Sequence, residues 1–132
     1  MKRSSSLWIT LLISIIMFGS AENLWAMGRK PETFAIKIRV DFGPAGKPAH
    51  EGTLFIERGT TPRDAVGQVF PVLFGMACCS LREIIAIDGV KIDPAQNYWW
   101  TCHVNGSRKV SPMRYKLKKG DLLEWRYIVE SQ

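Results

Sequence analysis

Three cysteines and a neighbouring histidine are the residues of this sequence best suited to bond formation or metal binding. Cys78 and Cys79 are adjacent, and Cys102 directly precedes His103. Successive residues of a strand point to opposite faces, so Cys102 and His103 cannot easily converge on one ion. The spacing of the cysteines also fails the iron–sulfur patterns. We therefore expect no metal site.

A disulfide is the chemistry we expect of these cysteines if the chain reaches an oxidising compartment. Adjacent cysteines could bond each other only through a strained ring, so we predict a bridge from Cys79 to Cys102, with Cys78 as the alternative partner. Closing a loop of about 24 residues stabilises a fold by about 3 kcal/mol in the chain-entropy account. The third thiol is left over and could pair between chains. A buried thiol and a reactive redox thiol are the alternatives.

Catalytic motifs add no further candidates. The sequence has no Ser/His/Asp set, no paired carboxylates in an obvious cleft and no phosphate-binding loop. His50 lies in a segment whose composition predicts a loop, and His103 is more typical of a surface histidine than of a catalyst. We therefore predict that this protein is not an enzyme.

Residues 97–104 are the most informative segment for binding, because they place several aromatic side chains on one predicted strand. Period-two alternation assigns the even-numbered residues from 98 to 104 to the core and leaves Trp99, Thr101 and His103 on the opposite face. An exposed tryptophan is typical of a binding surface, and the alternative is that a neighbouring segment covers it. With the turn that follows and the last strand, the candidate ligand-binding residues are Trp99, Thr101, His103, Asn105, Gly106 and Arg126.

The elements that must position these residues follow from hydrophobic periodicity. Thr61 and Pro62 mark the start of a short helix over residues 62–70. We expect a loop at 43–52 and a buried, irregular crossover at 71–80, for which an apolar lip around a ligand is the alternative. Alternating residues predict strands at 34–42, 53–57, 81–88, 97–104 and 122–129.

One short helix can cover only one face of such a sheet, so we predict an α+β domain in which a mixed sheet packs on the helix. On the last strand, the odd-numbered residues from 123 to 129 are assigned to the core, and Glu124 and Arg126 to the open face. The uncovered face is then expected to gather Lys37, Arg39, Phe55, Trp99, Thr101, His103, Glu124 and Arg126.

Residues 1–26 are expected to be a signal peptide. A short cationic start precedes an uncharged apolar run at 7–19, and small residues follow, so cleavage after Ala21 or Ala26 fits the rule for such peptides. A membrane anchor, which is the alternative, needs about 20 apolar residues, and Glu22 ends the run early.

The domain boundaries follow from this reading of the N-terminus. We expect residues 27–33 to form a flexible leader and residues 34–130 to form the folded domain. The protein would then be exported, to the periplasm or the extracellular space, and would meet a membrane only transiently through its signal peptide.

Composition is that of a globular protein and excludes several classes. The chain has 132 residues, of which 46% are hydrophobic and 23% charged. This excludes a disordered chain and the large barrel or dinucleotide-binding enzymes. The net charge is +6, but the basic residues are scattered apart from Lys116, Lys118 and Lys119 beside a predicted turn. Such a cluster is more typical of a solvated loop, and we expect no nucleic-acid partner.

A series of short motifs completes the second half of the chain: Trp-Trp at 99–100, Val-Asn-Gly at 104–106, Tyr-Lys-Leu at 115–117, Gly-Asp at 120–121 and Glu-Trp-Arg-Tyr at 124–127. With the helix start at 61–66, this pattern resembles the transcobalamin-like C-terminal domain family over roughly residues 36–129. The resemblance implies a β-grasp, ubiquitin-like fold and kinship with the small domain of vitamin B12 carriers. It makes cobalamin a candidate cofactor and offers no catalytic residues.

Two functions follow as hypotheses. The first is an exported, non-catalytic binding module that holds a small molecule, such as a flat corrinoid cofactor, against an exposed aromatic sheet face. The second is a protein–protein or cell-surface assembly domain whose partner adds a strand to a sheet edge.

Overall fold

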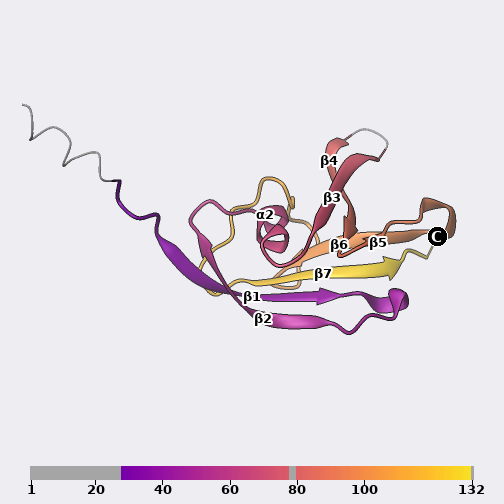
Figure 1. Ribbon diagram of the computed structural model, residues 1–132, viewed down its shortest axis with the longest axis horizontal. Helices are drawn as coiled ribbons and strands as arrows, with labels where there is room; N and C mark the ends of the chain where they lie inside the picture. The colour runs from indigo at the N-terminus through magenta and orange to yellow at the C-terminus, as the bar shows by residue number, and fades with distance from the viewer. Residues whose placement is uncertain (1–27, 78–79, 132) are drawn as a thin grey trace, which may run out of the picture. The chain divides into compact units, whose positions relative to one another are not determined.

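A parallel pair formed by β1 (Thr33–Asp41) and β7 (Leu122–Val129) lies at the centre of a four-stranded sheet in the computed structural model of this protein. The antiparallel strands β2 (His50–Glu57) and β6 (Tyr98–Val104) flank this pair, which gives the order β2-β1-β7-β6. The sheet is therefore mixed, and β2 and β6 are its two edges (Figure 1).

The structure describes residues 28–77 and 80–131, except for the side chains of residues 76–83. The chain divides into two compact units, Met1–Lys30 and Pro31–Gln132, and every element named here belongs to the second. The predicted signal peptide and the predicted partners of Cys102 lie outside the described residues. The remaining elements are η1 (Gly43–Ala45), α2 (Pro62–Gly67), β3 (Val72–Ala77), β4 (Ser80–Ile87), β5 (Val90–Lys91) and η2 (Pro94–Gln96).

The helix begins as the sequence predicts and ends earlier. Thr61 is the N-cap, and its hydroxyl oxygen accepts a hydrogen bond from the Asp64 amide at 3.3 Å. The α-helix stops at Gly67 rather than at Phe70, and tighter turns continue to Phe70. Glycine weakens a helix, and Pro71 disfavours helical geometry at the residue before it, so the early end has a local cause.

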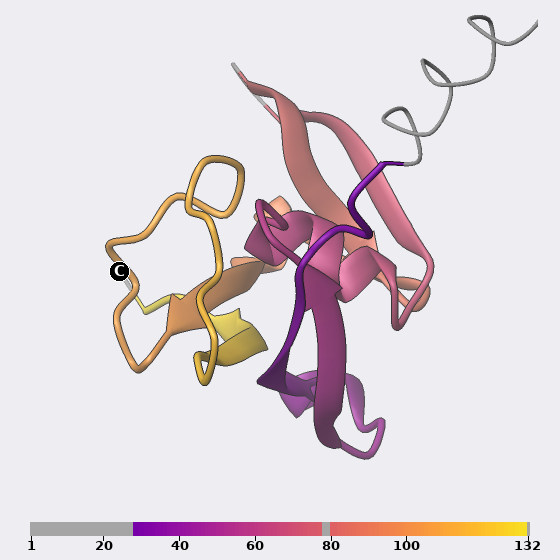
Figure 2. The same cartoon turned by 90° about the vertical axis from the view of Figure 1, so that its left-hand side faces the viewer.

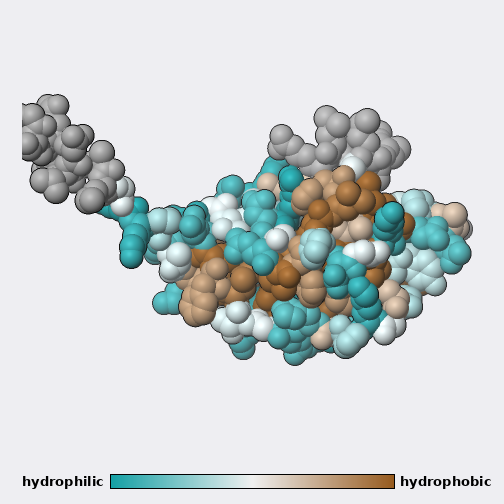
Figure 3. All heavy atoms as spheres, viewed as in Figure 1, coloured by the Kyte–Doolittle hydropathy of each residue, from teal (hydrophilic) through white to brown (hydrophobic). Residues whose placement is uncertain are grey.

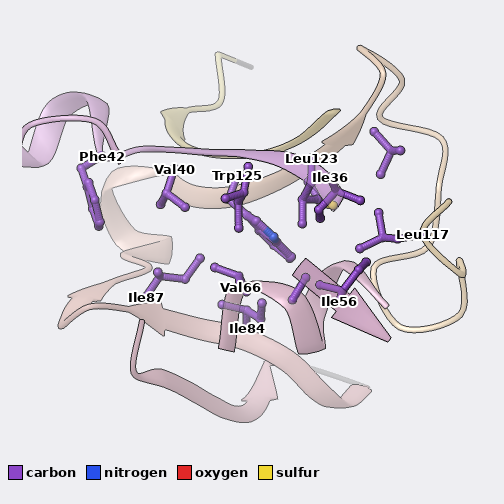
Figure 4. Packing of buried hydrophobic residues seen from close by; sticks show 14 residues of the cluster. Ile36, Val40, Phe42, Ile56, Val66, Ile84, Ile87, Leu117, Leu123 and Trp125 are labelled. Carbon is purple, nitrogen blue, oxygen red and sulfur yellow. The ribbon is translucent and has the colours of Figure 1, made fainter. Parts of the chain in front are cut away.

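The core lies between the inner face of the four-stranded sheet and a layer formed by α2 and β4. Ile36, Leu123 and Trp125 project from the sheet toward Val66 and Ile87 on the other side (Figure 4). Each such side chain contributes about 1.5–3 kcal/mol when removed from water. The Trp125 indole N–H also donates to the Pro62 carbonyl at 3.3 Å, which ties the central strand to the helix start.

A second, three-stranded sheet replaces the buried crossover that we expected at 71–80. The antiparallel order is β3-β4-β5, and β5 was not predicted. On β3 the side chains of Leu73 and Phe74 are 50% and 36% exposed, so this segment is not buried. Apolar surface gathers over this sheet in Figure 3, and Figure 2 shows α2 between the β3–β4 hairpin and the loop at 107–121.

Two predicted turns form as expected, and one strand begins earlier than predicted. Asn105 and Gly106 have φ of 50° and 80°, and the predicted turns at Asn105-Gly106 and Asp88-Gly89 both form with positive φ. β2 begins at His50, three residues before the predicted strand, and therefore takes up the end of the segment expected to be a loop.

Candidate functional site

The outer face of the four-stranded sheet, which we call the open face, is turned away from the core. Period-two alternation places Arg39 and Glu124 on this face, because their neighbours Ile38, Val40 and Leu123 are buried on the other. The open face is therefore built from the charged and polar positions of four strands.

A row of polar residues, three of which are charged, crosses the open face from edge to edge. Arg39 of β1 lies opposite Glu51 of β2 and opposite Glu124 of β7, and Glu124 lies opposite His103 of β6. The Arg39 Nε is 3.2 Å from a Glu51 carboxylate oxygen, and the Arg126 guanidinium donates to Glu124 at 2.8 Å. Opposite charges thus alternate across neighbouring strands, which stabilises cross-strand pairs.

A hollow of about 450 Å³ opens on this face over β1, β2 and the start of β7. Its volume lies within the range of small-molecule pockets, roughly 300–1,000 Å³. The residues that line it are Lys37, Ile38, Arg39, Glu51, Gly52, Thr53, Leu122 and Glu124.

Three polar groups that line the hollow differ in their burial and in their hydrogen bonds and ion pairs. The Glu124 side chain is only 9% exposed, so its carboxylate is largely removed from water. The buried Arg39 Nε has no aligned hydrogen-bond acceptor, despite its ion pair with Glu51. Among the ion pairs of the described residues, Lys37 has none. Of these three groups, only the Arg39 Nε is buried without a hydrogen bond, because Glu124 accepts from Arg126 and Lys37 is exposed.

The predicted binding residues of β6 lie on the open face beside the polar row, but they are less exposed than predicted. Trp99 is half-buried, and its indole N–H donates to the Asn97 side chain at 2.8 Å. Thr101 is only 4% exposed, and its hydroxyl lies 3.3 Å from both the His103 Nε2 and the Arg126 carbonyl oxygen. The face near these residues is therefore polar and closely packed rather than an exposed aromatic surface.

The predicted turn residues serve the fold. The Asn105 amide donates to Asp121 at 2.9 Å, and its oxygen accepts the Leu122 amide hydrogen at 2.9 Å. Gly106 provides the second positive φ of the turn. Of the six candidates, four therefore gather on the open face and two belong to a structural turn.

Two assignments on β7 and one on β2 differ from the sequence prediction. Glu124 was expected to be exposed and is 6% exposed, because Arg39 and His103 flank it in the sheet and Arg126 binds it. Val129 was expected in the core and is 51% exposed at the end of its strand. Glu51 was assigned to a loop, although extending the alternation of Leu54 and Ile56 back toward residue 50 could have placed it on the open face.

Cys102 is buried in the core, and within the described residues its thiol is free. Burial raises the pKa of this thiol to about 12, because the thiolate would lose its solvation. A reactive role is therefore disfavoured for Cys102. Its predicted disulfide partners, Cys79 and Cys78, lie outside the described residues, so the pairing stays a prediction.

The described part of the chain has neither a metal-ligating cluster nor a membrane-spanning helix. Within residues 28–77 and 80–131 there is no group of three His, Cys, Asp or Glu side chains placed to hold a metal ion. No helix in the same ranges has the length and apolar character needed to cross a membrane.

Comparisons with known proteins show similarity in fold. No protein-family model matches the sequence, and the comparison with curated proteins gives no match. Among solved structures, haptocorrin in complex with Cbi is similar over 77% of this chain, with a TM-score of 0.61 and 12% identity. This chain spans 26% of the haptocorrin chain.

A second solved structure is similar to this protein over nearly the whole length of its own chain. It is described as a "putative metal binding protein" from Ruminococcus gnavus ATCC 29149, and it is similar over 74% of this chain and 99% of that one. Its TM-score is 0.52 and its identity 17%. At these identities, both comparisons show a shared fold and assign no ligand.

Proposed function

We propose that this domain is a non-catalytic binding module whose small-molecule ligand lies in the hollow on the open face. The observation that carries the proposal is the buried Glu124 carboxylate in the same cavity as the ammonium of Lys37, which takes part in none of the ion pairs among the described residues. A ligand that carries both hydrogen-bond donors and acceptors would satisfy both groups at once. Pockets with a few convergent polar groups of this kind are the usual sites of small-molecule recognition.

The ligand chemistry that fits best is the primary amide. Lys37 can donate to an amide oxygen, and Glu124 can accept from an amide nitrogen. Because most charges of the face already pair with one another, a neutral polar ligand would cost less desolvation than an ion. Corrinoids carry amide side chains around a flat ring, so we propose a corrinoid as the candidate ligand, with its amide-bearing rim in the hollow.

We further infer a β-grasp fold and a distant relation to the transcobalamin-like C-terminal domain. The order β2-β1-β7-β6, its parallel central pair and the helix packed on one face support the inference. The fold shared with haptocorrin in complex with Cbi, which is cobinamide, supports the choice of ligand.

A titration with cobinamide and cobalamin tests the ligand. Binding should shift the corrinoid absorption spectrum and raise the free energy of unfolding by about 2.7 kcal/mol at a ligand concentration 100 times the Kd. If neither corrinoid shifts the spectrum or the melting temperature, the corrinoid proposal is wrong.

Matched variants test the place of binding. Lys37→Gln and Glu124→Gln each remove one charged partner of the ligand and should weaken binding about tenfold. Lys91→Gln is the control, because Lys91 is exposed on β5 and does not line the hollow. Equal affinity in all three variants would show that the ligand binds elsewhere.

We also propose that the protein is exported to the periplasm or the extracellular space. The support is the charge and hydropathy pattern of residues 1–26. Mass spectrometry of the protein recovered from the exported fraction should find an N-terminus that follows Ala21 or Ala26. Recovery of only the uncleaved chain from the cytoplasm would contradict export.

The free edge of β2 favours a second candidate function. Among the described strands, β2 pairs only with β1, and Phe55 on this edge strand is 71% exposed. An unpaired edge with an exposed aromatic residue can receive a strand from another protein. In this case Phe55→Lys would abolish capture of the partner from an extracellular extract and leave corrinoid binding unchanged.

A further inference from the structure

The outer edge of β2 carries backbone groups that the sheet itself does not use. The Arg58 amide, directly after this strand, donates to the Glu32 carbonyl at 2.9 Å. Bonded and non-bonded pairs alternate along an antiparallel ladder, so the even-numbered residues of β2 are the ones bonded to β1. The N–H and C=O groups of Glu51, Thr53 and Phe55 therefore point away from β1, toward the edge of the sheet.

The free length of this edge is set by the chain around it. It ends at Glu57, whose carbonyl oxygen accepts from the Thr60 amide at 3.1 Å and from the Thr60 hydroxyl at 2.7 Å. Before that point, residues 50–57 contain no lysine, arginine or proline, and their register with β1 has no bulge. Proteins usually protect an edge strand with such features. No described element lies beyond β2 in Figure 1, so this edge is open to a partner strand.

The opposite edge of the sheet, on β6, is already engaged at both ends. Tyr98 and Asp93 exchange backbone hydrogen bonds at 2.9 and 3.0 Å, and the Val104 amide donates to the Ser107 carbonyl at 3.0 Å. Among the described strands of this sheet, β2 is therefore the more open edge. A contact of β2 with β6 of another copy would also extend without closing, whereas two β2 edges related by a two-fold axis close into a dimer.

The register of such a dimer depends on which outward residue lies on the two-fold axis. With Glu51 on the axis, two carboxylates would be directly opposite each other, which is destabilising. With Phe55 on the axis, Glu57 would have to bond to the partner, but its carbonyl oxygen is already used by Thr60. With Thr53 on the axis, Glu51 would lie opposite the partner's Phe55, and all three outward residues would be paired through about six hydrogen bonds.

The side chains along β2 are compatible with this last register. On the inner face, Gly52 would lie opposite the partner's Leu54, and its missing side chain leaves room for this half-buried leucine. On the open face, the partner's Phe55 would approach Glu51, whose charge is balanced by Arg39 at 3.2 Å. Pairing would thus shield a Phe55 side chain that is 71% exposed, without bringing two unbalanced charges together.

We propose that two copies of this chain join their β2 strands across a two-fold axis at Thr53, so that their open faces form one continuous sheet. The proposal rests on the edge pairing proposed above for β2 and names the partner as a second copy. A single strand pair buries little surface, and small interfaces are weak. The dimer should therefore dissociate on dilution, with a Kd between about 1 μM and about 1 mM.

Sedimentation equilibrium of the full chain across this concentration range tests the dimer. Thr53→Lys places like charges directly opposite each other at the axis and should raise the dimer Kd about fivefold. Ala95→Lys is the control and should leave the Kd unchanged, because it adds the same charge to an exposed residue of η2, next to the other edge of the sheet. Melting temperatures check that both variants fold. A wild-type chain that stays monomeric up to about 1 mM, or an equal effect of both variants, would overturn the proposal.

Cysteine cross-linking tests the register. On oxidation, Thr53→Cys should form a disulfide between the two copies, because the Cα atoms of a bonded antiparallel pair are about 5.5 Å apart. The double variant Glu51→Cys/Phe55→Cys should link residue 51 of one copy to residue 55 of the other. Peptide mass spectrometry distinguishes these links from any that the native cysteines form. A link from residue 55 to residue 55, or no link in either variant, would overturn this register.

Comparison of self-association with capture from an extracellular extract separates this proposal from the one on which it rests. If the wild-type chain is monomeric while Phe55→Lys still abolishes capture of another protein, a second copy is the wrong partner and the edge remains a binding site. If the chain neither associates with itself nor captures a protein through β2, the proposed edge function is wrong as well.

Discussion

The side chain of Asn105 is hydrogen-bonded to the buried carboxylate of Asp121, at 2.9 Å between the amide nitrogen and Oδ1. The other oxygen of Asp121 accepts from the Tyr115 hydroxyl at 3.2 Å and from the Lys118 amide at 2.9 Å. These hydrogen bonds join the start, the middle and the end of the connection between β6 and β7. Burial raises the pKa of Tyr115, and the charge of Asp121 and its hydrogen bond to the Tyr115 hydroxyl raise it further.

Replacing Asn105 should separate the strain of its backbone from the value of its hydrogen bonds. Asn105→Ala should destabilise the fold by about 3 kcal/mol, because it loses two hydrogen bonds and keeps a Cβ at a φ of 50° without the side-chain hydrogen bonds that let asparagine adopt this geometry. Asn105→Gly loses the same bonds without the strain and should be about 1 kcal/mol less destabilising. Denaturant unfolding measures both, and equal values would show that the backbone is not strained.

Gly43 and Gly46 form a matched pair at the two ends of η1. Both have positive φ, 39° and 76°, but a Cβ on Gly43 would lie 2.5 Å from the Tyr127 carbonyl oxygen, whereas a Cβ on Gly46 meets nothing within 4 Å. Gly46→Ala should therefore cost about 1 kcal/mol and Gly43→Ala about 3 kcal/mol or more. Thermal melts of both variants test this, and similar losses would contradict the close approach of η1 to β7.

The buried thiol of Cys102 should make stability fall in alkali. Its pKa rises from 9.0 to about 12 on burial, so between these values the unfolded chain loses a proton that the folded chain keeps. The stabilisation due to the buried neutral thiol is therefore complete below pH 9 and is lost toward pH 12. Over this range the free energy of unfolding falls by up to about 1.4 kcal/mol per pH unit.

Cys102→Ala isolates the thiol from other groups that titrate in alkali. Tyr127 also has a raised pKa, first from burial and then from the nearby charges of Asp93 and Tyr98, and it acts in the same direction. In this variant the free energy of unfolding should no longer fall from about pH 9 through the Cys102 thiol, and only the fall due to tyrosine should remain. Under reducing conditions, rapid alkylation of Cys102 in the folded wild-type protein would contradict its burial.

The helix start depends on Thr61, which is 4% exposed. Thr61→Ala removes the acceptor of the Asp64 amide and should destabilise the domain by about 1 kcal/mol. Thr53→Ala, on the exposed surface of β2, is the control and should change stability by less than about 0.5 kcal/mol. Denaturant midpoints distinguish them, and equal small losses would show that the cap contributes nothing.

The sequence alone determined the parts of the fold that depend on neighbouring residues in the chain. Alternation on β1 and most of β7 assigned Ile36, Ile38, Leu123 and Trp125 correctly to the core. The turn at Asn105-Gly106 and the cap at Thr61 followed from residue types whose backbone preferences are local. These features were predictable because each is set within a few residues.

Only the tertiary structure decided which side chains of the open face are buried and where the face is hollow. Glu124 looked exposed by alternation, yet Arg39, His103 and Arg126 from three strands surround it. The apolar run that includes Phe74 looked buried, yet it forms β3 of a separate sheet. Burial depends on side chains that are distant in sequence and adjacent only after the strands pair, so periodicity within one strand cannot reveal it.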